Sequence, residues 1–250
     1  MPAVVAQPVT DFLSRALARA GVLPAREAEA AVRAGRLTLN GRVVKQPLTT
    51  LKRGDVVRVD GRAVSLATKT LALAFHKPPG CVTSHADPQG RPTVFDVLSK
   101  ALPKDLRRYG WHAVGRLDVD TTGLLLFTND EHLVAHATRP ETKLPKRYLA
   151  RVQGRATSHK LAELRTPKGA PPVGVRVRAE NEVELTIAEG SFHQVKRMLG
   201  AVGLPVLALH REAVGLLELD VPLGSARLLT DDEISRKLRF PSPAGGRGSG

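Results

Sequence analysis

The most constraining feature of this sequence is an apolar run at residues 124–127, Leu-Leu-Leu-Phe, that directly follows a polar turn. The turn contains two carboxylates, Asp118 and Asp120, together with Arg116. A short apolar run with polar boundaries is typical of a buried strand. Because a buried strand is a rigid support, a carboxylate on the turn that feeds it is held in one place. The sequence therefore predicts a reactive acid at the floor of a cleft.

The charge of the chain indicates a polyanionic partner. The chain has 250 residues, with 38 Lys and Arg against 24 Asp and Glu, which leaves a net charge of +14. This excess favours nucleic acid over an acidic membrane surface. Aromatic residues make up only 4%, which argues against a broad platform for stacking single-stranded bases.

Cysteine usage and hydropathy set further limits. The single cysteine, Cys81, excludes a disulfide framework and a cysteine-based zinc site, and the pair His132 and His136 lacks a third metal ligand. The first residues lack the basic and apolar segments of a signal peptide. No apolar run approaches the roughly 20 residues that span a bilayer. We expect a soluble, cytoplasmic monomer without membrane association.

The first 61 residues predict a small domain. Helices are expected over 12–20 and 25–34, followed by a hairpin with Asn40-Gly41 at its turn and a short strand within 55–61. The end of the chain is rich in Pro, Ser and Gly, which is typical of disorder. The predicted boundaries are 1–61 for the small domain, 62–70 for a linker, 71–239 for a larger domain and 240–250 for a disordered tail.

Strands and helices recur in the larger domain without strict alternation. This favours an α+β fold with a largely antiparallel sheet over a doubly wound parallel one. The predicted strands are 71–75, 124–128, 146–152, 183–187 and 206–209, and the predicted helices are 94–98, 131–138, 158–164 and 192–202.

Basic residues cluster in the small domain around the second helix and the hairpin. No acid interrupts this cluster after Glu29, which favours phosphate binding over the alternative of an ordinary solvated face. Residues 10–61 resemble the S4 RNA-binding domain, with the best agreement over Arg-Glu-Ala-Glu-Ala-Ala-Val-Arg-Ala-Gly-Arg at 26–36 and the hairpin that follows. The resemblance therefore implies RNA contacts by Arg26, Arg33, Arg36, Arg42 and Lys45.

Two further blocks place charged and aromatic groups together. Gln194, Lys196 and Arg197 lie near the start of the last predicted helix, where cations oppose the helix dipole. They are expected to serve an internal carboxylate or a phosphate, although an ordinary basic helix face is the alternative. Lys146 and Tyr148 share one face of a strand, and core packing would equally explain the tyrosine.

Four motifs follow one another along the chain: Phe75-His-Lys-Pro-Pro-Gly80, Gly115-Arg-Leu-Asp118 with its strand, Lys146-Arg-Tyr148, and Glu189-Gly with His193-Gln-Val-Lys-Arg-Met198. In this order they resemble the RsuA/RluB family of pseudouridine synthases, and the resemblance spans nearly the whole chain. It implies a catalytic domain with a largely antiparallel mixed sheet, flanking helices and a central cleft. It also implies isomerisation of a uridine in ribosomal RNA, without cofactor or metal.

The residues of the last motif, His193 to Met198, favour small-subunit (16S) rRNA as the substrate. Large-subunit (23S) rRNA is one alternative, and a non-catalytic RNA-binding ribosome-assembly factor on the same fold is another. In either case the expected partner is ribosomal RNA or a ribosomal assembly intermediate. Ser191-Phe192 departs from the arginine-tyrosine pair that is frequent in the family, which removes one positive charge near the site.

The resemblance also implies roles for the carboxylates and their partners. Asp118 is expected to be the catalytic group, with attack on the sugar C1′, attack on the uracil C6 and abstraction of a sugar proton all open. Asp120 is expected to cap its turn. Lys196, or alternatively Arg197, would pair with Asp118 and keep it ionised.

The remaining roles concern the RNA. Tyr148 would stack on the target base, and Arg116 would enter the RNA stack when the uridine flips out. Gln194 would support the active site. Lys77 would contact the RNA.

Overall fold

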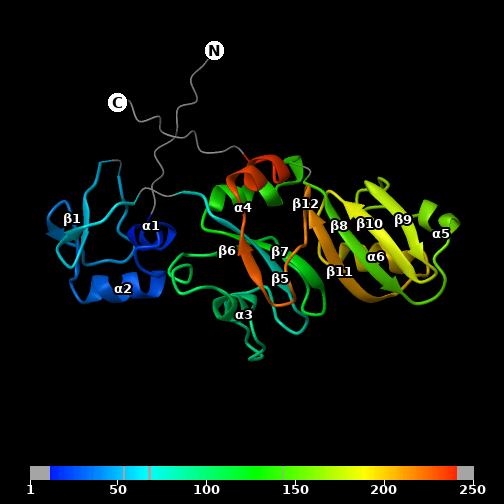
Figure 1. The fold of residues 1–250 in the computed structure, drawn as a ribbon, viewed down its shortest axis with the longest axis horizontal. Coiled ribbons are helices and arrows are strands. Elements are labelled where there is room, and N and C mark those ends of the chain that lie inside the picture. The colour runs from blue at the N-terminus through cyan, green and yellow to red at the C-terminus, as the bar shows by residue number, and fades with distance from the viewer. Residues whose placement is uncertain (1–11, 53, 67–68, 143, 241–250) are drawn as a thin grey trace, which may run out of the picture. The chain divides into compact units, whose positions relative to one another are not determined.

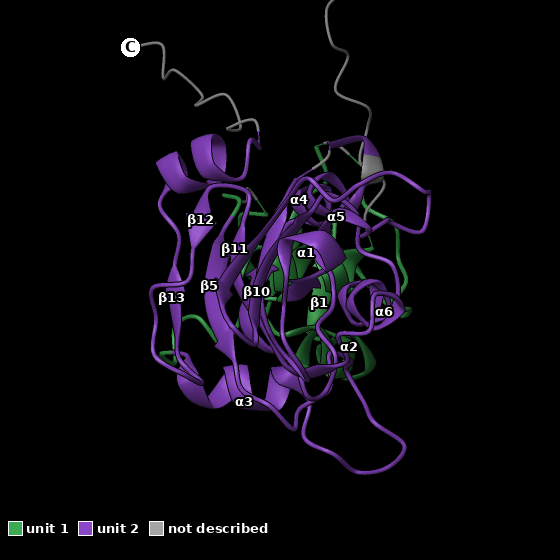
Figure 2. Cartoon of the chain, turned by 90° about the vertical axis from the view of Figure 1, so that its right-hand side faces the viewer, with its two compact units in different colours: residues 1–70, 103–111 green, residues 71–102, 112–250 purple. Residues whose placement is uncertain are grey.

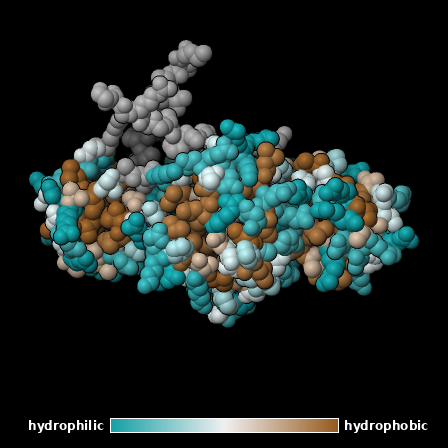
Figure 3. All heavy atoms as spheres, viewed as in Figure 1, coloured by the Kyte–Doolittle hydropathy of each residue, from teal (hydrophilic) through white to brown (hydrophobic). Residues whose placement is uncertain are grey.

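The structure is a computed structural model that describes residues 12–52, 54–66, 69–142 and 144–240. The chain divides into two compact units (Figure 2). Unit 1 comprises residues 1–70 and 103–111, and unit 2 comprises residues 71–102 and 112–250. No described helix is long and apolar enough to cross a membrane. Hydrophilic residues are interspersed with hydrophobic ones across the face of the molecule in Figure 3.

Unit 1 contains the two helices and the small sheet that the sequence predicts. Buried residues such as Leu17, Ala28 and Leu37 form its core. Asn40 and Gly41 have φ values of 51° and 81°, as a two-residue hairpin turn requires, so the predicted hairpin is confirmed. The elements are α1 (Leu13–Arg19), α2 (Ala25–Arg33) and an antiparallel sheet of order β2-β1-β3-β4, made of β1 (Leu37–Leu39), β2 (Arg42–Val43), β3 (Val57–Val59) and β4 (Arg62–Ala63).

Two segments belong elsewhere than predicted. Arg62–Ala63 pair with β3, and Leu66 packs on the core of unit 1, so this part of the predicted linker belongs to the sheet. Two residues are too few for an alternating pattern to be recognised. Residues 103–111, assigned to the larger domain, belong to unit 1, where the Gly110 amide donates to the Ala18 carbonyl at 2.9 Å. A turn-rich segment without periodicity does not reveal which core it joins.

Unit 2 is built on a nine-stranded mixed sheet (Figure 1). The order is β13-β5-β7-β11-β8-β10-β9, while β6 pairs with β7 and β12 with β11. Among the described pairs only β7 with β11 is parallel, so the predicted α+β fold with a largely antiparallel sheet is confirmed. The strands are β5 (Ala72–Lys77), β6 (His112–Val114), β7 (Thr122–Thr128), β8 (Lys146–Val152), β9 (Gly174–Ala179), β10 (Glu182–Ile187), β11 (Val206–Val214), β12 (Leu217–Glu218) and β13 (Ala226–Leu228).

Helices flank this sheet, and two elements match their predicted bounds, α4 and β8. β11 continues five residues past the predicted end, because its polar residues after Leu209 interrupt the apolar pattern. Strands β6, β9, β12 and β13 were not predicted. The helices are α3 (Val94–Ala101), α4 (Glu131–Thr138), α5 (Ser158–Ala162), α6 (Gln194–Ala201) and the short turns η1 (Pro140–Thr142) and η2 (Glu233–Lys237).

β7 is buried on both faces, as predicted for residues 124–127. Leu124 and Leu126 belong to the same core cluster as Leu133 of α4. On the opposite face the Phe127 ring meets the Phe95 ring of α3, with centroids 5.5 Å apart. Figure 1 accordingly shows α4 and α3 on opposite sides of β5 and β7. This packing makes β7 a rigid base for the turn that precedes it.

Phe240, the first residue of the predicted tail, is described by the structure. Phe240 packs against the core of unit 2 and against the His136 ring, with centroids 5.4 Å apart. It is therefore part of the folded unit, whereas the rest of the predicted tail, 241–250, lies outside the described residues.

Candidate active site

The loop of residues 115–121, here called the catalytic loop, joins β6 to β7 and carries Asp118. The Gly80 amide donates to the Val119 carbonyl at 2.7 Å. The Thr83 hydroxyl donates to the carbonyl of the residue before Asp118 at 2.8 Å. The segment after β5 thus fixes the loop backbone on both sides of Asp118.

Lys77 belongs to this support, and its predicted contact with RNA is wrong. The side chain is completely buried, and its ammonium donates to the carbonyls of Pro78 at 3.0 Å, Val119 at 3.3 Å and Thr121 at 3.0 Å. Burial lowers the pKa of Lys77. A lysine without exposed surface cannot reach a phosphate, so this residue holds the catalytic loop instead.

The parallel pairing of β7 with β11 brings a distant arginine to the site. Arg211 pairs with Gly123, which has a φ of 111°. A Cβ atom at position 123 would collide with the backbone of Arg211, so only glycine allows the two strands to approach this closely. The Arg211 side chain is 4% exposed and donates to the Leu124 carbonyl at 2.6 Å.

Two basic side chains lie beside the carboxylate of Asp118, whose side chain is 28% exposed. His193 Nε2 is 3.4 Å from one oxygen, and Lys196 Nζ is 3.5 Å from the other. Lys196 is shared, because it also donates to both oxygens of Asp120, at 2.7 and 2.9 Å. Asp120, expected only to cap its turn, is thus the nearer partner of Lys196. The hydrogen bond from Lys196 lowers the pKa of Asp120.

A tight turn before α6 delivers His193 to this cluster. His193 has a left-handed φ of 49° and directly precedes the helix, which begins two residues later than predicted. The Gln194 side-chain oxygen accepts from the amide and the hydroxyl of Ser191, both at 3.0 Å, and this closes the turn. Gln194, predicted to support the active site, thus holds the turn that carries His193. Arg197, the alternative partner of Asp118, donates to the Ser191 hydroxyl at 3.3 Å instead.

Asp118 opens onto a cavity of about 580 Å³. Lys146 and Tyr148, predicted to share a strand face, both line it, as does Arg211. Tyr148 is 8% exposed, and its hydroxyl accepts from Arg211 at 3.4 Å. Burial, with a smaller contribution from the charge of Arg211, lowers the pKa of Lys146 to about 8. The cavity thus combines an aromatic ring with two cations besides the pair at Asp118.

Three buried polar atoms in residues lining this cavity have no hydrogen-bond partner among the described residues. They are Thr121 Oγ1, Gln194 Nε2 and Arg211 Nη2. Buried polar groups are normally paired, and leaving one unpaired costs about 1–3 kcal/mol. The three side chains belong to the cavity wall, but these atoms themselves are buried.

The exposed groups around the cavity are suited to contact a larger partner. Arg116 is exposed and lines the cavity two residues before Asp118. Phe192, part of the departure from the family pattern, is 75% exposed and stacks on His193, with ring centroids 3.8 Å apart. Among the described residues no group of three or more His, Cys, Asp or Glu could hold a metal ion.

The five basic residues predicted to bind RNA in unit 1 are all exposed. Arg36 makes a two-point ion pair with Asp60, at 2.5 and 2.7 Å, and Arg33 lies 3.4 Å from Glu29. The other three make no ion pair with a described residue. They are Arg26, Arg42 and Lys45.

Comparison with known proteins identifies the family of the chain. Residues 72–201 match the model of the RNA pseudouridylate synthase family, and residues 13–57 match the S4 domain. The chain belongs to the RNA pseudouridylate synthase family. The family match covers the catalytic loop, β8 and α6, which contribute Asp118, Tyr148 and Lys196.

Relatives of this pseudouridine synthase extend over most of its length. It is 38% identical to the ribosomal small subunit pseudouridine synthase A of Yersinia pestis, over 90% of this chain and 95% of the relative. It is 34% identical to the ribosomal large subunit pseudouridine synthase B of Escherichia coli (strain K12), over 86% of this chain and 76% of the relative. A crystal structure of a pseudouridylate synthase superimposes with a TM-score of 0.61 at 31% identity, over 91% of this chain and 99% of the other.

Several groups in the pseudouridine synthase site escaped the sequence analysis. His193 stood in a recognised motif, and its position three residues before Lys196 was a usable signal. Asp120 was visible but given a local role. Arg211 carries no local signal, since it follows an apolar stretch of β11 and reaches the cavity only through the pairing of β7 with β11.

Proposed function

We propose that this pseudouridine synthase converts one uridine of ribosomal RNA to pseudouridine, with Asp118 as the catalytic carboxylate. The observation that carries the proposal is a carboxylate on a fixed loop, 3.4 Å from His193 and 3.5 Å from Lys196, at a cavity lined by Tyr148. The names of the relatives support ribosomal RNA as the substrate.

The reaction requires a positioned acid and no second reactant. The N1–C1′ bond of uridine breaks, the base turns, and a C5–C1′ bond forms, while a proton leaves C5 and one is gained at N1. Asp118 acts on the sugar or the base as nucleophile or base. His193 and Lys196 lie 3.4 and 3.5 Å from its carboxylate oxygens in a half-buried site. Asp120 holds Lys196 in place.

The cavity supplies what a flipped-out uracil needs. Uracil presents two carbonyl oxygens and one N–H group, and the polar side chains that line the cavity, Lys146 among them, offer donors to those oxygens. Tyr148 provides a ring on which the base stacks. Flipping costs a few kcal/mol, and these contacts, with Arg116 in the vacated stack, offset that cost.

Small-subunit rRNA is the proposed target, bound in part through unit 1. The motif that contains His193, Lys196 and Arg197 favours this choice, and the 38% identity to a small-subunit enzyme supports it. Large-subunit rRNA is the competing substrate, supported by relatives at 34% identity. The exposed cations of unit 1 supply affinity through phosphate contacts.

The test is pseudouridine mapping at nucleotide resolution. Purified protein is added to unmodified small-subunit and large-subunit rRNA, as naked RNA and as assembly intermediates, with the Asp118→Asn variant in parallel. We expect one new pseudouridine in small-subunit rRNA with the wild type and none with the variant. A product in large-subunit rRNA would identify that RNA as the substrate instead. No product in any RNA would overturn the proposal, and biological function that survives Asp118→Asn would favour an assembly factor.

A further inference from the structure

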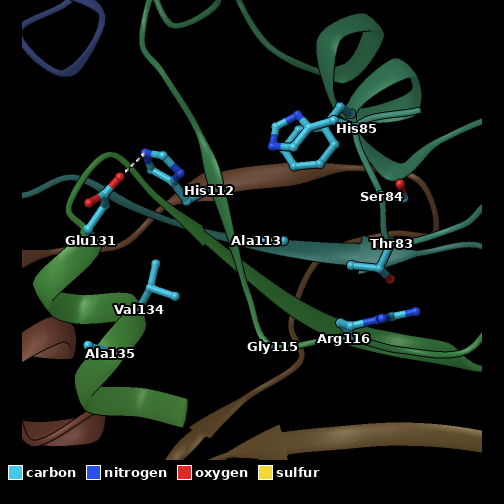
Figure 4. Close-up of a pocket in the computed structure, with 11 residues that line it drawn as sticks. Thr83, Ser84, His85, His112, Ala113, Gly115, Arg116, Glu131, Val134 and Ala135 are labelled. Carbon is cyan, nitrogen blue, oxygen red and sulfur yellow. Dashed lines mark ion pairs between the residues drawn. The ribbon is translucent and has the colours of Figure 1, made fainter. Parts of the chain in front are cut away.

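A second pocket of unit 2 adjoins the Asp118 cavity and has no part in the reaction above (Figure 4). It has a volume of about 470 Å³, within the range of small-ligand sites. Gly115 and Arg116 of the catalytic loop line both spaces. A nucleotide next to a uridine held at Asp118 would therefore lie at this pocket.

One wall of the second pocket is an aromatic shelf. The His85 ring stacks on the Phe95 ring, with centroids 3.9 Å apart and planes 13° from parallel. Phe95 is half-buried, whereas His85 is exposed, so Phe95 supports one face of the histidine ring and leaves the residue open to a partner. Successive bases of single-stranded RNA stack on shelves of this kind, and every base can use them.

The opposite wall is formed by α4 and combines apolar contacts with a carboxylate. Val134 and Ala135 are half-buried and line the pocket. Glu131 is 62% exposed and lies 4.0 Å from the His112 ring, the pair joined by a dashed line in Figure 4. A carboxylate repels phosphates, so its place beside an RNA site points to the edge of a base. Adenine, cytosine and uracil each offer a carboxylate one donor group, whereas guanine places its N1–H and its amino group side by side, so that both carboxylate oxygens accept at once.

Stabilisation of α4 by Glu131 does not explain the whole arrangement. Glu131 is the first residue of the helix, where an acid is favourable. That role requires neither the stacked pair of His85 and Phe95 across the pocket nor the apolar side chains of Val134 and Ala135 beside Glu131. A nucleobase uses all three: a ring on which to stack, apolar contacts, and an acceptor at its edge.

We propose that this pocket binds a second base of the RNA, beside the target uridine, and selects guanine there. The base stacks on His85, and its N1–H and amino groups donate to Glu131. Arg116 lines both spaces, so a side chain that enters the vacated stack also borders this second base. This inference rests on the proposed function for the identity of the neighbouring site, but it concerns RNA binding and not turnover.

The first test is a binding selection that needs no knowledge of the natural target. A pool of RNA hairpins carries one fixed uridine in a loop whose other positions are randomised, and the bound fraction is sequenced. We expect the wild type to enrich guanine about tenfold over the other bases at one position near the uridine, which corresponds to roughly 1.4 kcal/mol. Glu131→Gln and His85→Ala should reduce this to less than about twofold.

Matched controls separate the pocket from general charge or ring effects. Glu141→Gln and His159→Ala change exposed residues that line neither space, and both should keep the wild-type selection. A wild type without selection at any position, or variants that select as the wild type does, would overturn the proposal.

The second test asks whether the His85 ring and the selected base contact each other. Hairpins with an abasic site at the selected position are bound by wild type and His85→Ala, and affinities are measured by fluorescence anisotropy. Loss of the base and loss of the ring should each weaken binding about tenfold, with little further loss when combined. Fully additive losses would count against stacking. Both tests measure RNA binding and do not depend on turnover. A wild type that makes no pseudouridine would therefore refute the proposed function, while the binding results would still test the second pocket.

Discussion

Two charged clusters in unit 2 contain the same kinds of groups but are used in opposite ways. The closing cluster ties β13 to η2 through Arg227, which donates to Asp220 at 2.6–3.0 Å and to Glu233 at 2.8 and 2.9 Å. Glu233 also accepts from the Thr230 amide at 3.0 Å and from Lys237 at 3.3 Å. Each carboxylate there has a close cation in good geometry.

The catalytic cluster leaves its key acid less well satisfied. Lys196 binds Asp120 at 2.7 Å, but the nearest basic nitrogens to Asp118, on His193 and Lys196, are at 3.4 and 3.5 Å. Asp118 also lines the adjoining cavity. A charge network in which every carboxylate has close partners stabilises the fold. A carboxylate that has only distant partners and lies beside a cavity indicates where a ligand binds.

The largest expected effect separates the two acids of the catalytic cluster. Asp118→Asn should lower the single-turnover rate of pseudouridine formation by at least about 10³-fold, because an amide is neither nucleophile nor base. Asp120→Asn should cost only about tenfold, since it loosens Lys196 without removing the reactive group. RNA affinity of each variant is the control. Equal losses in the two variants would contradict the assignment of Asp118.

The closing cluster should respond in stability and not in rate. Arg227→Met leaves the carboxylate of Glu233, 12% exposed, without its main partner, and should lower the free energy of unfolding in urea by about 2 kcal/mol. The folded variant should keep its single-turnover rate. Arg236→Met is the matched control, because its ion pair with Asp232 is exposed and should contribute less than about 0.5 kcal/mol.

A cation in the cavity should cost stability. The pKa of Lys146 is lowered from 10.5 to about 8, so the folded state binds fewer protons than the unfolded state between these values, and wild-type stability rises with pH in that window. Lys146→Met should remove this rise and, at pH 7, stabilise the fold by about 1 kcal/mol while lowering activity. Urea unfolding at pH 7 and at higher pH measures it. A destabilised variant would indicate that Lys146 has a structural partner.

Acid should weaken the closing cluster specifically. The hydrogen bond from Arg227 lowers the pKa of Glu233 from 4.5 to about 2. The stability that this pair contributes is therefore fully present above pH 4.5 and is lost as pH falls towards 2. Glu233→Gln should unfold more easily at neutral pH and lose less stability on acidification than the wild type. Parallel acid unfolding curves for the two proteins would contradict this role.

The smallest effect extends the comparison to the surface of unit 1. Arg26 and Arg42 have no ion pair among the described residues, whereas Arg33 and Arg36 pair with acids. Changing the first two to Gln should flatten the salt dependence of RNA binding by up to about 0.9 per lost contact on a duplex and 0.7 on a single strand. The same change at Arg33 and Arg36 should have less effect. Identical slopes would show that surface pairing does not matter.

Local patterns were sufficient for the supports of the site. The apolar run before Thr128, the bounds of α4 and the Asn40-Gly41 hairpin all follow from periodicity and turn chemistry within a few residues. They failed for β12 and β13, whose few residues carry no pattern, and for Lys77, whose charge suggested exposure. Burial of a lysine depends on carbonyl groups that a distant loop supplies.

The sequence alone identified an acid held by a buried strand, its place in an ordered set of motifs, and a basic domain ahead of it. Only the tertiary structure showed that Lys196 binds Asp120 more closely than Asp118 and that His193 is the second basic side chain beside Asp118. It also showed that Arg211 lines the cavity. The physical reason is distance. Strand burial is a short-range property of the chain, whereas an ion pair depends on ångström-scale positions that packing of remote elements sets.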